Sequence, residues 1–147
     1  MSLSKPKSQA GFTLLELLIV IVIIGILALL IIPNITSAPK KARDTQRKTD
    51  LKAIQKGLEE YYVSNSAYPA ALTDLTGTNP PIIKTIPTDP KNSGDLVYTY
   101  TPTASGGTNT TYTLKGCLEN GGDNAQGVAS DGACTTSGKG FQLVNNN

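Results

Sequence analysis

An apolar run over residues 12–32, FTLLELLIVIVIIGILALLII, constrains this chain more than any other feature, because its one charged side chain is Glu16. A helix of this length spans about 30 Å, the thickness of the hydrocarbon core of a bilayer. The alternative is a buried helix of a soluble domain, but a chain of 147 residues has too small a core to cover a helix that is apolar on every side. We therefore predict a membrane-spanning helix.

A cleaved secretory signal peptide is the second alternative for this run. The apolar region of such a peptide is about 7–15 residues long and ends at small residues where cleavage occurs. Here the run is longer and is followed by Pro33, whereas the small residues Ala10 and Gly11 precede it. Processing at those residues would remove a polar leader, residues 1–11, and leave the apolar segment on the mature protein.

Charge and composition argue against several classes of function. The chain has 13 basic and 11 acidic residues, a net charge of +2, which is not the basic field of a nucleic-acid-binding domain. It has no histidine, which removes the commonest general base and metal ligand. We expect no enzyme activity, no catalytic residue and no cofactor.

After the apolar run, hydrophobic residues recur at three- and four-residue steps, which predicts an amphipathic helix over residues 37–66 that ends near Ser64–Ser66. Its apolar face contains Ala42, Leu51, Ile54, Leu58, Tyr61 and Tyr62. The same segment carries a basic cluster diluted by Asp44 and Asp50. We expect this cluster to be a solvated face or a contact with lipid headgroups rather than a DNA-binding surface. Its members are Lys40, Lys41, Arg43, Arg47 and Lys48.

Residues 67–147 are rich in Thr, Gly, Asn and Pro and predict loops and an antiparallel sheet. We expect an extended loop over 69–95, strands at 96–101, 111–115 and 141–144, and a hairpin loop over 102–110. The fold class is therefore α+β, with the helix packed on a short sheet. The side chains expected to face the helix are Tyr98, Tyr100, Tyr112, Leu114, Phe141 and Leu143.

Cys117 and Cys134, the two cysteines of the chain, predict a disulfide and an oxidising compartment, with two reduced thiols as the alternative. The loop between them carries Glu119, Asp123 and Asp131, whose carboxylates are of the kind that calcium binds. Their spacing does not match an EF-hand. A polar surface loop is therefore favoured over a calcium site.

The junction GFTLLE, from Gly11 to Glu16, resembles the processing site of type IV prepilins. The resemblance implies that a membrane peptidase cuts after Gly11 and that the new N-terminal residue, Phe12, is N-methylated. Glu16 matches a family glutamate needed for subunit assembly, and Gly25 and Pro33 match residues further along the helix. The implied partners are copies of the chain itself, a prepilin peptidase, an inner-membrane platform protein and an assembly ATPase, with nucleic acid only as cargo.

The physical chemistry of Glu16 agrees with this resemblance. Cleavage before Phe12 creates an α-amine that is mostly cationic at neutral pH. In an apolar bundle, the Glu16 carboxylate and the Phe12 ammonium of a neighbour would compensate each other's desolvation and fix the register between subunits. Alternatively, Glu16 pairs within its own chain, because residues four apart on a helix are adjacent.

Gly25 and Pro33 weaken the helix locally. We hypothesise that the helix is continuous in the membrane and unwinds between these residues in the filament, as similar pilins do. A simple kink is the alternative. The expected organisation is a leader (residues 1–11), a transmembrane and filament-core helix (12–36), an amphipathic helix (37–66) and a loop and sheet region with a disulfide loop (67–147).

Three functions remain open. A surface type IV pilus for adhesion, twitching motility or DNA uptake is favoured by the Thr/Asn-rich C-terminal half. A pseudopilus of type II secretion or competence is the alternative, since IPTDP (Ile86–Pro90) resembles a segment of major pseudopilins, although the tryptophan usual after it is absent. The third is a signal-anchored monomer with a ligand-binding ectodomain.

Orientation in the membrane is a point of conflict. More basic residues follow the apolar run than precede it, which by the positive-inside rule places the C-terminal region in the cytoplasm. The disulfide and the processing site require the opposite. We therefore expect a single-pass protein with its C-terminal domain outside the cytoplasm, which then joins an extracellular filament.

Overall fold

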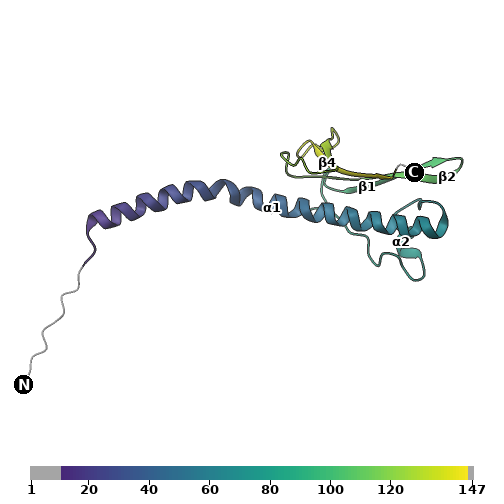
Figure 1. The fold of residues 1–147 in the computed structure, drawn as a ribbon, viewed down its shortest axis with the longest axis horizontal. Helices are drawn as coiled ribbons and strands as arrows, with labels where there is room; N and C mark the ends of the chain where they lie inside the picture. The colour runs from purple at the N-terminus through teal and green to yellow at the C-terminus, as the bar shows by residue number, and fades with distance from the viewer. Residues whose placement is uncertain (1–10, 146–147) are drawn as a thin grey trace, which may run out of the picture. The chain divides into compact units, whose positions relative to one another are not determined.

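The structure, a computed structural model, describes residues 11–145, and over residues 30–36 it describes the backbone alone. Two helices, α1 (Leu14–Asn65) and α2 (Asp74–Gly77), precede four strands, β1 (Tyr98–Ser105), β2 (Thr108–Cys117), β3 (Val128–Ser130) and β4 (Lys139–Asn145) (Figure 1). The α+β class is confirmed. Apart from Gly11, the predicted leader lies outside the described residues.

The chain divides into two units after Ser37. In the first unit the backbone is helical from Leu14 onward, at Gly25 and Pro33 as well. Within the part of the chain that the structure describes, no helix is both long and apolar enough to cross a membrane. The side chains of residues 30–32, the end of the predicted span, lie outside the described part.

In the second unit, α1 packs one face on the sheet. Leu51, Ile54 and Leu58 are fully buried, as the helical spacing predicts, whereas Ala42, expected on this face, is exposed. The sheet residues predicted to face the helix belong to the same core: Tyr112, Leu114 and Phe141 are buried in it, and Tyr98, Tyr100 and Leu143 pack against it.

The sheet is antiparallel with strand order β1-β2-β4-β3. The predicted hairpin loop over 102–110 is wrong, because β1 and β2 continue to a tight turn at Gly106 and Gly107, which both have positive φ. Pro102 stays within β1 because β1 is an edge strand and needs no donor on its outer side. Strand β3 was not expected from the sequence.

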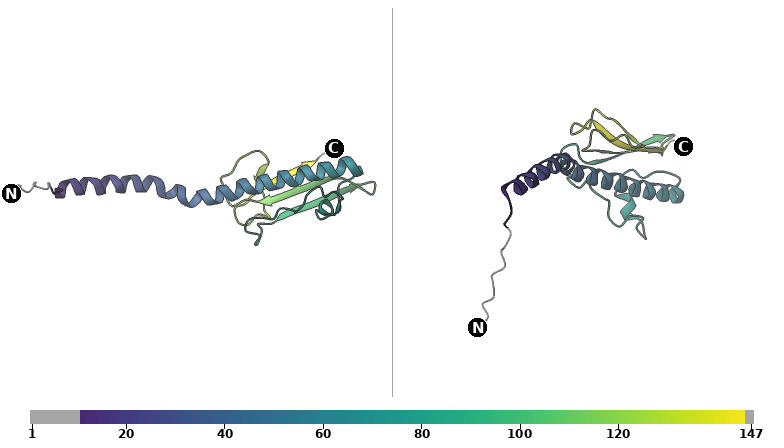
Figure 2. Two further views of the ribbon diagram at one scale, coloured as in Figure 1. Left: turned by 90° about the horizontal axis from the view of Figure 1, so that it is seen from below. Right: turned by 60° about the vertical axis from the view of Figure 1, so that its left-hand side comes forward.

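The segment predicted as an extended loop over 69–95 contains the one-turn helix α2. Its Leu75 is fully buried in the core. Figure 1 and the right view of Figure 2 place α2 on the side of α1 that faces away from the sheet. There Gly57 makes room for the loop, since a Cβ at that position would lie 2.6 Å from the Ile83 side chain.

Candidate functional site

The described part of the chain begins with three residues outside any helix, Gly11, Phe12 and Thr13. Helix α1 is then started by a capping box. The backbone N–H and the hydroxyl of Thr13 both donate to Oε2 of Glu16 at 2.8 Å, and the Glu16 N–H donates to the Thr13 hydroxyl oxygen at 3.2 Å. Glu16 is therefore held by Thr13 rather than by Phe12, the own-chain partner that helical spacing suggests.

An exposed apolar surface follows the capping box. Phe12 is 93% exposed, and every large apolar side chain from Leu14 to Leu29 is at least 49% exposed. Gly25 lies in this stretch, and a Cβ at its position would have no atom within 4 Å apart from its chain neighbours and the backbone of its own helix. So large a contiguous apolar surface is typical of a segment that is covered by lipid or by other protein chains.

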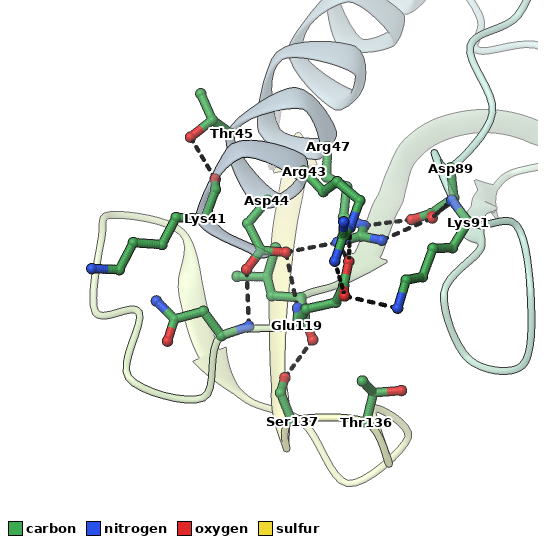
Figure 3. Close-up of polar contacts among 12 residues, drawn as sticks. Lys41, Arg43, Asp44, Thr45, Arg47, Asp89, Lys91, Glu119, Thr136 and Ser137 are labelled. Atoms are coloured by element: carbon green, nitrogen blue, oxygen red, sulfur yellow. Dashed lines mark hydrogen bonds and ion pairs between the residues drawn. The ribbon is translucent and has the colours of Figure 1, made fainter. Parts of the chain in front are cut away.

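A second site lies in the globular unit, where Arg47 is completely buried among three carboxylates (Figure 3). Its guanidinium bonds Asp89 through Nε at 2.6 Å and Nη2 at 2.9 Å. Its Nη1 donates to Asp44 and Glu119, each at 2.8 Å. The cluster thus ties α1 to the loop that holds Asp89 and to the segment after β2.

Two more cations balance this cluster. Arg43 makes a bidentate contact with Glu119 at 2.6 and 2.7 Å, and Lys91 reaches the same carboxylate at 3.0 Å. Asp44 accepts the backbone N–H groups of Glu119 and Asn120, each at 2.9 Å. Figure 3 shows these side chains converging on Glu119 from α1 on one side and from Lys91 on the other.

The cluster perturbs the ionisation of its members. The bidentate bond from Arg43 holds the pKa of Glu119 far below its usual value, against the opposing effect of burial and with the help of Arg47. Burial works to raise the pKa of Asp89, but the bonds from Arg47 and two backbone N–H groups lower it overall. These carboxylates are therefore ionised at neutral pH, and the buried charges are paired rather than isolated.

The loop between Cys117 and Cys134 is held by a disulfide and by two ion pairs. Cys117 and Cys134 form a disulfide with their Cα atoms 5.3 Å apart. Lys48 pairs with Asp123 at 2.5 Å, and Lys115 pairs with Asp131 at 2.8 Å. These pairs lower the pKa of each of the two aspartates.

The three carboxylates considered for calcium do not converge on one point. Glu119, Asp123 and Asp131 are each neutralised by different lysine or arginine side chains. Among the described residues, no group of three acidic, cysteine or histidine side chains could hold a metal ion. The donor set therefore does not fit a calcium ion.

The basic cluster was partly misinterpreted from the sequence. Lys40 and Lys41 are exposed, but Arg47 is at the centre of a buried network and Arg43 and Lys48 bind the C-terminal loop. The prediction that this cluster is a solvated face is therefore wrong for Arg47. A signal was present: Arg47 stands four residues before Leu51, in the row of buried helix positions. The Thr13-x-x-Glu16 spacing was likewise a recognisable capping signature.

Comparisons with known proteins give a family match at the N-terminal segment and relatives that match longer stretches of the chain. Residues 6–32 match the family described as the prokaryotic N-terminal methylation motif. A Vibrio cholerae protein named type II secretion system core protein G is 34% identical over 134 residues, which cover 82% of this chain and 90% of that protein. No solved structure gives a significant match.

Two more relatives carry the same name. The Pseudomonas aeruginosa protein is 45% identical over 69 residues, 47% of this chain and 49% of that protein. The match thus spans about half the length of that relative. The Escherichia coli protein is 38% identical over 96 residues, 56% of this chain and 66% of that protein.

Proposed function

The chain belongs to the family of type II secretion system core protein G, and from this premise we propose that it is a major pseudopilin, a structural subunit that polymerises into the pseudopilus of a secretion system. A leader ending at Gly11 is removed, Phe12 becomes the methylated N-terminus, and the apolar part of α1 anchors the subunit in the membrane before assembly. The implied machinery is a prepilin peptidase, a platform protein and an assembly ATPase.

The observation that carries this proposal is the exposed apolar surface from Phe12 to Leu29, which lies within the segment that matches the N-terminal methylation motif. Such a surface is covered by lipid before assembly and by neighbouring helices afterwards. Glu16 is the one charged side chain in it. In the filament, we propose that Glu16 pairs with the Phe12 ammonium of a neighbour, which would fix the register of the subunits. Unwinding between Gly25 and Pro33 would accompany assembly.

Deletion of the gene in its host tests the choice of filament. The proposal expects exoproteins to accumulate in the periplasm while twitching motility and DNA uptake stay normal. Complementation with the wild-type gene should restore secretion, and complementation with Gly11→Leu, which blocks leader removal, should not. Normal secretion in the deletion strain would contradict the proposal.

A surface pilus is the second candidate, favoured by the C-terminal loop. Between Gly121 and Ser137 its residues are mostly exposed, and most of them are polar or glycine. The Cys117–Cys134 disulfide closes most of the loop, as suits a filament surface outside the cell. In the same deletion strain this candidate expects loss of twitching or adhesion with normal secretion. If the chain is a signal-anchored monomer, the deletion strain should show neither the secretion defect nor the loss of twitching or adhesion, and the leader should remain uncut.

A further inference from the structure

We propose that Thr13 is a positioning residue for leader removal: its capping box with Glu16 starts α1 at Leu14 and so keeps the Gly11–Phe12 peptide bond outside the helix, open to a peptidase. The inference rests on the proposed function, which supplies the cleavage. It adds a role for Thr13, and a role for Glu16 that precedes assembly.

The capping residue Thr13 directly follows Phe12, so α1 begins at Leu14, just after the Gly11–Phe12 bond that is to be cut. Glu16 occupies the donors of Thr13, both its N–H and its hydroxyl, while the Thr13 oxygen accepts the Glu16 N–H. These contacts hold Thr13 as the residue before the first helical turn. Gly11 and Phe12 lie outside the helix, and both are exposed.

Without this stop, the helix can extend toward its N-terminus through Phe12, although Gly11 opposes the extension. A long apolar helix follows, and Ala10, a strong helix former, stands directly before Gly11. In a helix the peptide groups are engaged in backbone hydrogen bonds, and cleavage then requires a local opening that lowers the rate in proportion to the population of the open form. A capped start at Leu14 removes that opening step for the Gly11–Phe12 bond.

Glu16 then has two separable roles. At the N3 position of the capping box it needs only an acceptor oxygen, which glutamine also supplies. As the partner of the Phe12 ammonium after cleavage it needs a negative charge. Glu16→Gln should therefore preserve leader removal and impair assembly, whereas Thr13→Val should slow leader removal itself. Thr13→Ser keeps the hydroxyl and serves as the matched control.

The test is a cleavage assay on the full-length precursor in proteoliposomes with purified prepilin peptidase, in which mass spectrometry follows release of the leader. We expect Thr13→Val to lower the initial rate about five-fold, the factor expected for loss of one N-cap. Thr13→Ser and Glu16→Gln should stay within about two-fold of wild type. Carbon chemical shifts of Gly11 and Phe12 should move toward helical values in Thr13→Val alone.

The outcomes separate the two proposals. Cleavage of Thr13→Val at the wild-type rate, or a Thr13→Ser precursor as slow as Thr13→Val, would overturn the positioning role while leaving the pseudopilin proposal in place. A wild-type precursor that is not cut between Gly11 and Phe12 would overturn both.

Discussion

The two parts of α1 differ in the burial of their side chains. From Leu14 to Leu29 the helix exposes large apolar residues that nothing in the described chain covers, whereas from Asp44 to Leu58 it buries one face so completely that even Arg47 is enclosed. The difference lies in the available partners, because the sheet and loops cover the second part. An apolar surface as exposed as that of the first part is typical of a segment that is covered by lipid or by other protein chains.

The largest effect should come from a charge placed in the exposed part. Ile21→Asp should abolish filament formation, because an unpaired carboxylate in an apolar bundle costs about 3 kcal/mol or more in every subunit. Electron microscopy of assembled filaments measures this, with Ile21→Leu as the control. The fold should be unaffected. All six tyrosines lie in the second unit, so their near-ultraviolet circular dichroism should not change. Normal filaments from Ile21→Asp would show that the exposed part of α1 is not buried in an apolar bundle.

Arg47→Met should have the largest effect on the stability of the second unit. It leaves Asp44, Asp89 and Glu119 without their shared cation, and we expect the free energy of unfolding to fall by about 3–5 kcal/mol. Urea denaturation of the full chain in detergent, followed by tyrosine circular dichroism, measures this. Lys52→Met, an exposed position of the same helix, is the control with a change below about 0.5 kcal/mol. A loss of less than about 1 kcal/mol for Arg47→Met, which is about a five-fold change in the unfolding equilibrium constant, would contradict a stabilising role of the buried Arg47 cluster.

Removal of the disulfide should have an intermediate effect. The double variant Cys117→Ser, Cys134→Ser releases a closed loop with a sequence separation of 17, for which about 3 kcal/mol is expected. The ion pairs of Lys48 and Lys115 should still hold the loop, so the near-ultraviolet spectrum at low denaturant should remain native. A molecule that unfolds without denaturant would show that these pairs contribute little.

Acid should weaken the second unit through Glu119 and Asp89. Since their pKa values are lowered in the folded state, the unfolded chain binds protons first as the pH falls. Stability should therefore be constant from pH 7 to about 5 and fall below about pH 4.5. Glu119→Gln should flatten this fall, whereas Glu60→Gln, at an exposed position of α1, should not. An equal slope for both variants would contradict the account.

The smallest effect should come from calcium. Because Glu119, Asp123 and Asp131 are each neutralised by lysine or arginine side chains, millimolar calcium or a chelator should shift the melting temperature by less than about 1 °C. Lys48→Gln and Lys115→Gln free Asp123 and Asp131 and serve as the comparison. A clear stabilisation of the wild type by calcium would show that the carboxylates can rearrange around a metal ion.

The predictable parts of the molecule are those set by local periodicity. The spacing of Leu51, Ile54 and Leu58 was sufficient to place the helix. The short strand-like segments around Tyr98, Tyr112 and Phe141 were sufficient to place three of the four strands that the described residues form. Strand β3 has three residues, too few for a periodic pattern. The burial of Arg47 depends on Asp89 and Glu119, which are 42 and 72 residues away in the chain, so no local pattern could reveal those partners.

Mass spectrometry of the N-terminus of protein recovered from assembled filaments tests whether the chain is processed and polymerises as proposed. We expect a chain that begins at Phe12, carries one N-methyl group and has no other modification than the Cys117–Cys134 disulfide. A chain that retains its leader and is found only in membranes would contradict the account and leave an anchored monomer.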